Sequence, residues 1–252
     1  MVEQRPWPIT GSLAAGLLTI GGVFIIYINR RATISLGLLR IGLIAYQWWR
    51  DIRREATLQG HHREVVERGI RWGMVLFIIS EVIFFFSFFW AYFHSRLSPT
   101  LELGIVWPPV LIYSFNPFRV PLLNTTILLT SGLSVTWAHH RLLTGDLTRA
   151  IQSLILTILL GVYFRVVQGY EYIEARFSLA DSCYGRCFFV ATGFHGLHVL
   201  IGTLFLLIRW LRLIKGELSR THHFGLEAAA WYWHFVDVVW IFLFISIYWW
   251  GS

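Results

Sequence analysis

The chain has 252 residues, of which 56% are hydrophobic and 14% are charged. Soluble domains usually carry about 25% charged residues, and this composition excludes a disordered chain or a secreted disulfide scaffold. The net charge of +7 comes from basic residues spread between apolar runs. That spacing fits loops at lipid headgroups better than a nucleic-acid groove, so no nucleic-acid partner is expected. We therefore expect a multi-span helical membrane protein.

Seven apolar runs are long enough to cross, or nearly to cross, a bilayer core of about 30 Å. They cover residues 11–28, 34–49, 70–93, 122–139, 150–168, 184–208 and 226–250. The second run is short and holds Arg40, so it is the weakest. No run alternates like a barrel strand. The sequence predicts a single transmembrane domain over residues 1–252.

Two polar connections between the apolar runs have distinct compositions. Residues 50–68 mix acidic and basic side chains, which predicts a solvated helical hairpin on the membrane surface. Residues 95–121 hold five of the seven prolines and predict an ordered, irregular surface loop. Cys183 and Cys187 are spaced as on one helix face, where a disulfide is rare, so we expect free thiols at a helix start.

The basic residues indicate the topology. If seven spans alternate sides, 13 basic residues lie on the N-terminal side, six lie on the other, and two fall within spans. This bias predicts the N-terminus inside and the C-terminus outside. The N-terminus has no Arg/Ser-rich transit peptide and no clear cleavage site, so the first run is expected to be a retained span.

Glu81 is the most conspicuous polar residue inside a span. It lies 11 residues after Ile70, close to the membrane midplane. An ionised carboxylate there is costly, which favours the neutral acid. Two interpretations stay open, a proton-relay or lipid-facing carboxyl and a protonated side chain hydrogen-bonded to a neighbouring helix.

Histidines also fall inside or at the ends of spans. His195 and His198 share one face of the sixth run, His234 shares a face with Asp237, and His139 and His140 close the fourth run. Such residues could ligate haem or metal. Because the sixth run also carries glycines that suit close helix packing, the pattern favours polar packing. No catalytic motif is present.

Ordered motifs along the whole chain identify a family resemblance. They run from Trp7–Gly11 (WPITG) to Tyr248–Ser252 (YWWGS), and two are long and specific. These two are FFVATGFHGLH at Phe188–His198 and HHFGLEAAAWYWHFVDVVW at His222–Trp240. The chain resembles the cytochrome c oxidase subunit III family.

The resemblance implies an all-α membrane protein with a two-helix pair and a five-helix bundle around a lipid-filled cleft. It implies a non-catalytic core subunit of the oxidase that passes electrons from cytochrome c to O2 and pumps protons. Haem a, haem a3 and copper would belong to subunits I and II, with no cofactor, catalytic residue or metal ligand in this chain.

The partners implied are subunits I and II, accessory subunits and phospholipids. The chain would stabilise subunit I, hold phospholipid and support proton uptake. The implied location is the mitochondrial inner membrane, with a bacterial plasma membrane less favoured. A haem-binding or proton-conducting seven-helix membrane protein is the alternative.

The resemblance also implies roles for individual residues. Glu81 matches the family's buried carboxyl beside the lipid cleft. The implied lipid contacts are made by Tyr46, Trp49, Arg54, Glu55, His62, Arg212 and Lys215. Four departures from the family pattern stand out, at Glu217, Arg141, Arg165 and Arg186. Glu217 puts one headgroup contact in doubt, and Arg165 and Arg186 are expected to form an outer charge cluster with Glu171, Glu174 and Asp181.

Overall fold

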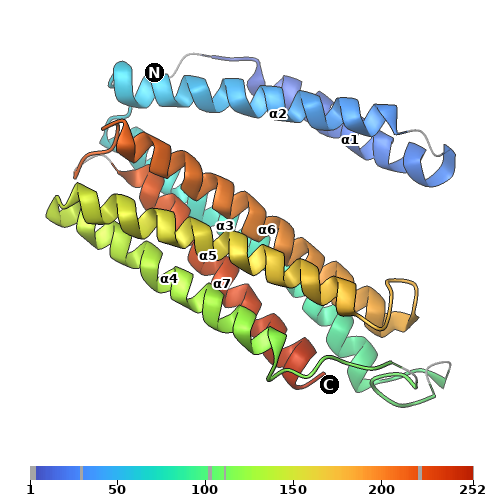
Figure 1. The fold of residues 1–252 in the computed structure, drawn as a ribbon. Helices are drawn as coiled ribbons and strands as arrows, with labels where there is room; N and C mark the ends of the chain where they lie inside the picture. Colours follow the sequence, from blue (N-terminus) through green and yellow to red (C-terminus); the bar gives the residue numbers. More distant parts are fainter. Residues whose placement is uncertain (1–3, 29–30, 102–103, 111, 221–222, 252) are drawn as a thin grey trace. The chain divides into compact units, whose positions relative to one another are not determined.

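The computed structural model describes residues 4–28, 31–101, 104–110, 112–220 and 223–251. Within these residues the chain forms seven α-helices and two short π-helical segments, with no strand (Figure 1). The all-helical fold class is therefore confirmed. In chain order the elements are α1 (Trp7–Ile28), α2 (Ala32–Arg53), η1 (Arg54–Leu58), α3 (Glu64–Leu97), α4 (Val120–Thr144), α5 (Leu147–Glu174), α6 (Ser182–Ile214), α7 (Phe224–Leu243) and η3 (Phe244–Trp249).

Five of the described helices are long and apolar enough to cross a membrane, namely α1, α3, α5, α6 and α7 with its continuation η3. The other two, α2 and α4, have 22 and 25 residues, which is long enough to span, but they carry more polar side chains. The seven-span topology, with its N-terminus inside, thus stays a prediction.

The chain divides into two compact units, residues 1–70 and residues 71–252. In the first unit α1 and α2 lie antiparallel and in close contact. A side-chain carbon at Gly21 would come within 2.6 Å of the Ile34 backbone, and one at Gly37 within 2.9 Å of the Leu18 backbone. Small residues at these points let the two backbones approach, as is common between membrane helices.

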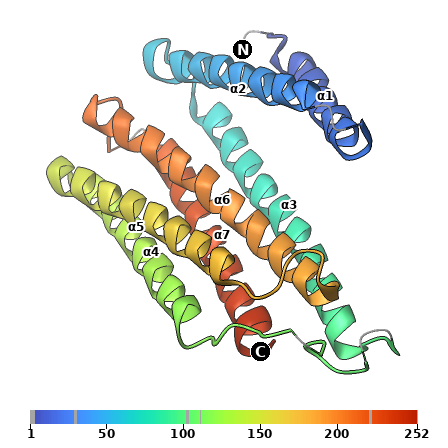
Figure 2. The ribbon, with the colours of Figure 1, turned by 45° about the vertical axis from the view of Figure 1, so that its right-hand side comes forward.

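The second unit is a helix bundle with a buried core. α4 packs against α5 and α7, and α6 packs against α5 and α7 (Figure 2). Trp233 and Trp240 of α7 are fully buried in this core. α3 joins the bundle through side chains, since the Tyr92 hydroxyl donates to the Ser246 carbonyl oxygen at 2.8 Å.

The α4–α5 connection shows how local sequence sets the packing. Gly145 takes a φ of 83° after the last turn of α4, a conformation that glycine adopts readily. Asp146 then caps α5, because its carboxylate accepts a hydrogen bond from the Arg149 backbone N–H at 3.1 Å. This tight turn places α4 and α5 side by side.

Residues 50–68 are helical apart from residues 59–63, as the predicted hairpin requires, but its two arms are the ends of longer helices. α2 runs on to Arg53, η1 continues to Leu58, and α3 already begins at Glu64. Charged residues therefore extend the long helices beyond their apolar runs, and Glu64 and Glu67 suit the first turn of α3. The described residues between Leu97 and Val120 are largely irregular, as the prolines predict.

Candidate functional site

Glu81 lies in α3 and meets a histidine from α6. Its Oε2 atom is 2.8 Å from Nε2 of His198, and the two side chains are 21% and 9% exposed. The two residues are 117 positions apart in the sequence. Glu81 is thus hydrogen-bonded to a neighbouring helix, which was one of its two interpretations.

The other ring nitrogen of His198 fixes its tautomer. Nδ1 lies 2.7 Å from the Phe194 carbonyl oxygen, and a carbonyl oxygen can only accept. Nδ1 therefore carries a proton, which leaves one proton to be shared between Nε2 and Glu81 Oε2. The rings of Phe84, Phe85 and Tyr232 lie within 6.3 Å of the imidazole, so the contact has an apolar surround.

The remaining histidines inside the spans also have protein partners. His195 is fully buried, and its Nε2 atom donates to the Val236 carbonyl oxygen at 3.2 Å. His234 places Nε2 3.1 Å from the Thr136 hydroxyl and Nδ1 3.6 Å from Asp237. These contacts match the polar packing expected from the sequence.

The predicted lipid contacts near the end of α2 differ in exposure. Tyr46 and Trp49 are 66% and 63% exposed, and Arg54 is exposed in η1. Glu55 is buried, and its Oε1 atom pairs with Nη2 of Arg5 at 2.6 Å. Its carboxylate is therefore neutralised within the protein rather than presented to headgroups.

The charged groups at this end of the first unit act on one another. Burial alone would raise the pKa of Asp51, but hydrogen bonds from Arg50 and Trp7 and the charge of Arg5 hold that pKa below its usual value. His62 is half-buried, and this burial lowers the pKa of its ring although the carboxylates of Glu55 and Glu67 oppose the shift.

Arg212 and Lys215 lie at the end of α6. Lys215 is exposed, whereas Nε of Arg212 pairs with Oε2 of Glu217 at 2.9 Å. Glu217, which departs from the family pattern, thus forms an ion pair with Arg212. Of the two predicted lipid contacts at this helix end, Lys215 is therefore the one that stays exposed.

Comparison with known proteins gives the family. The family model described as cytochrome c oxidase subunit III matches residues 1–252. The chain is 60% identical over 252 residues to cytochrome c oxidase subunit 3 of Sus scrofa, covering 100% of this chain and 97% of that protein. It is 61% identical over 252 residues to the protein of the same name from Aedes aegypti, covering 100% and 96%.

The chain belongs to the cytochrome c oxidase subunit III family. It is accordingly a core subunit of the oxidase, an oxidoreductase complex, and a multi-pass protein of an inner membrane. The resemblance seen in the sequence is confirmed over its full length.

The expected outer charge cluster of this family member makes no ion pair among the described residues. Among the described residues, neither Arg165 nor Arg186 has a carboxylate oxygen within 4.0 Å. The guanidinium of Arg165 instead lies against Gly196 of α6, where any side chain would collide with it. Asp181 is engaged elsewhere, since it accepts a hydrogen bond from the Ser178 backbone N–H at 2.7 Å.

Sequence reasoning placed Glu171 in the outer charge cluster and missed its position inside the bundle. It is 1% exposed and accepts a hydrogen bond at 3.2 Å from Nε2 of Gln168, which is fully buried. The buried hydroxyl of Tyr248 faces both side chains. Gly161, Phe164, Gln168 and Glu171 are all buried and follow a helical spacing, so this periodicity could have placed Glu171 inside the bundle.

Proposed function

We propose that this chain is the non-redox core subunit of the proton-pumping oxidase. In this role it stabilises subunit I, holds phospholipid and supports proton uptake, while haem a, haem a3 and copper belong to subunits I and II. The Glu81–His198 contact is the main support for this proposal.

Two of the three histidines inside the spans, His198 and His234, are poorly available to a haem, whereas the buried Nδ1 atom of His195 has no hydrogen-bond partner among the described residues. A haem ligand needs a free ring nitrogen aimed at the iron. His198 has both nitrogens in hydrogen bonds, one to Phe194 and one to Glu81. Nε2 of His234 contacts the Thr136 hydroxyl at 3.1 Å, and its Nδ1 atom faces the Asp237 carboxylate at 3.6 Å. This favours a polar packing role over the haem-binding alternative.

The Glu81–His198 pair has the chemistry of a neutral proton-holding site. With Nδ1 of His198 protonated, a neutral ring presents Nε2 as an acceptor, and Glu81 must then donate as the carboxylic acid. Because an ion pair in an apolar surround pays a large desolvation cost, the neutral form is favoured. A carboxyl that holds a proton inside the membrane fits a role in supporting proton uptake.

The lipid-holding role is supported by exposed side chains at helix ends. Tyr46 and Trp49 are amphipathic aromatic residues that suit the membrane interface. Arg54 and Lys215 are exposed cations, and each such residue contributes about 1 kcal/mol to binding anionic headgroups. Glu55 and Arg212 are paired within the protein, so their direct contact with lipid would be weaker than the family resemblance implies.

The proposed location is the mitochondrial inner membrane. The relatives from Sus scrofa and Aedes aegypti are animal proteins, and the oxidase of animals is a mitochondrial complex. This favours the mitochondrion over a bacterial plasma membrane. The proposed partners are subunits I and II together with accessory subunits and anionic phospholipids.

A carbodiimide experiment tests the proposal. The purified oxidase carrying wild-type chain or Glu81→Gln is treated with a membrane-soluble carbodiimide, which reacts with protonated carboxyl groups. We expect this chain to be labelled in the wild type and to lose that label in Glu81→Gln, with an unchanged ratio of haem to copper. Glu217→Gln is the matched control and should keep the label.

Two results would contradict the proposed function. Equal labelling of the wild type and Glu81→Gln would show that Glu81 is not the protonated carboxyl. Loss of haem in His198→Asn, measured from the visible spectrum of the complex, would favour a haem-binding chain instead.

A further inference from the structure

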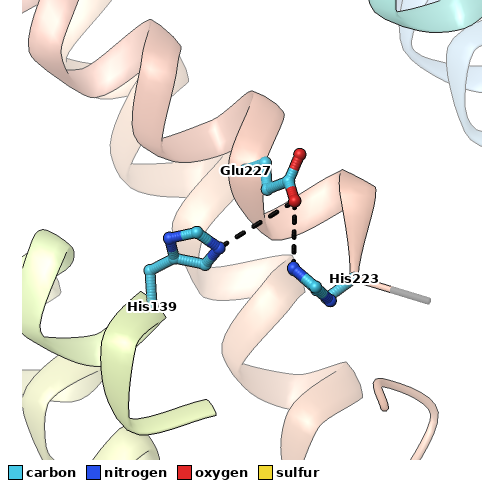
Figure 3. A group of neighbouring side chains, drawn as sticks. All are labelled: His139, His223 and Glu227. Carbon is cyan, nitrogen blue, oxygen red and sulfur yellow. Dashed lines mark ion pairs between the residues drawn. The ribbon is translucent and has the colours of Figure 1, made fainter. Parts of the chain in front are cut away.

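Three potential metal ligands meet at one end of the bundle. His139 lies in the last turns of α4, His223 directly precedes α7, and Glu227 lies in the first turn of α7. Figure 3 shows the two imidazoles and the carboxylate pointing toward one another. They come from two helices that already pack together, so the group is held by the fold.

The distances suit a shared cation. One ligand atom from each residue lies within 4.8 Å of the others. Oε1 of Glu227 is 2.9 Å from Nε2 of His223 and 4.0 Å from Nε2 of His139. The two ring centroids are 5.3 Å apart. Zinc–nitrogen bonds of about 2.0–2.1 Å would require only small side-chain rotations from this arrangement.

A nitrogen of this group has no hydrogen-bond partner among the described residues. Nε2 of His139 is buried and has no hydrogen-bond partner there, because the carboxylate is too far for one. The residue His223 is 9% exposed. A buried nitrogen without a partner is costly, and a cation between the three residues would satisfy it.

Arg71 of α3 orients the carboxylate. Its Nη1 atom is 2.6 Å from Oε2 of Glu227, on the side away from the imidazoles. This contact directs Oε1 toward the two rings, in the way that outer partners orient metal ligands. Two imidazoles and one carboxylate suit a borderline metal such as Zn2+ better than Ca2+ or Mg2+, which prefer oxygen ligands.

We propose that His139, His223 and Glu227 form a binding site for Zn2+ or a similar divalent transition-metal ion. Three protein ligands leave a fourth position for water or an external ligand. The ion would link the end of α4 to the start of α7, and through Arg71 it would also brace α3. The site holds no electron carrier and is separate from the proposed Glu81–His198 pair.

Zinc binding to the assembled oxidase tests the site. The complex is stripped with a chelator and then titrated with radioactive zinc by equilibrium dialysis. We expect His139→Asn and Glu227→Gln to lose one zinc equivalent, or to bind it at least about tenfold more weakly. His140→Asn is the matched control, because His140 is adjacent, exposed and outside the group, and it should bind like the wild type.

A second measurement covers variants that fail to assemble. In the wild-type complex, zinc should slow the modification of His139 by diethyl pyrocarbonate relative to that of His140, as read by peptide mass spectrometry. Equal zinc binding in all four complexes, or zinc-independent modification of His139, would overturn the proposal and leave a hydrogen-bonded polar cluster.

Discussion

In the α1–α2 pair the helices meet through glycines, whereas in the α4–α7 bundle they also exchange hydrogen bonds between side chains. Gly21 and Gly37 lie directly on the opposing backbone of the pair. In the bundle, the Ser134 and Thr157 hydroxyls are 2.8 Å apart, and Nε1 of Trp233 donates to the Ser131 hydroxyl at 2.8 Å. Both regions are apolar, yet they are joined differently.

The difference reflects how membrane helices associate. Lipid is as apolar as leucine, so burial of apolar surface gives little drive, and close packing or interhelical hydrogen bonds must supply it. Polar contacts between α1 and α2 gather at one end, where Trp7 donates to Asp51 at 3.1 Å. The pair should therefore be sensitive to added volume, and the bundle to the loss of hydrogen bonds.

The largest effect is expected from adding one methyl group to the pair. Gly21→Ala should destabilise it by about 1–3 kcal/mol, because the new carbon would collide with the Ile34 backbone. Gly22→Ala is the matched control, since a side-chain carbon there would meet nothing within 4 Å. SDS titration of the purified full chain in mixed micelles, followed by circular dichroism, measures both. Equal stability of the two variants would contradict the close packing of α1 and α2.

A smaller effect is expected from removing one hydrogen bond in the bundle. Ser134→Ala should cost about 0.6 kcal/mol, because interhelical hydrogen bonds in membranes are weak on average. Ser87→Ala is the control, since the Ser87 hydroxyl donates to Phe84 of its own helix. The same SDS titration applies, with Thr157→Val completing a double-mutant cycle. Zero coupling between Ser134 and Thr157 would show that their contact adds no stability.

The sequence predicted the helices and the family, but it did not predict the contacts between helices. The helices, the family and the position of Glu81 near the midplane followed from hydropathy and motifs. The partner of Glu81 did not, because His198 is 117 residues away and no local pattern links them. Periodicity could have shown that Glu171 is buried, but the sequence analysis assigned it to an outer charge cluster instead. The burial of Glu55 depends on Arg5, about 50 residues earlier in the chain, which only the folded pair brings near.

The smallest expected effect concerns pH at the end of the pair. The pKa of Asp51 in the folded chain lies below its ordinary value of 3.8, so the unfolded chain binds its proton more readily. The Asp51 contacts with Arg5 and Trp7 therefore contribute stability above pH 3.8, and this contribution is lost as the pH falls through the folded value. Asp51→Asn should remove that part of the pH dependence in SDS titrations. Because the Arg5 and Asp51 side chains keep 22% and 12% of their surface exposed and water screens such pairs in part, the change should be smaller than that of Gly21→Ala. An unchanged pH dependence in Asp51→Asn would mean that other carboxylates govern the acid sensitivity of the pair.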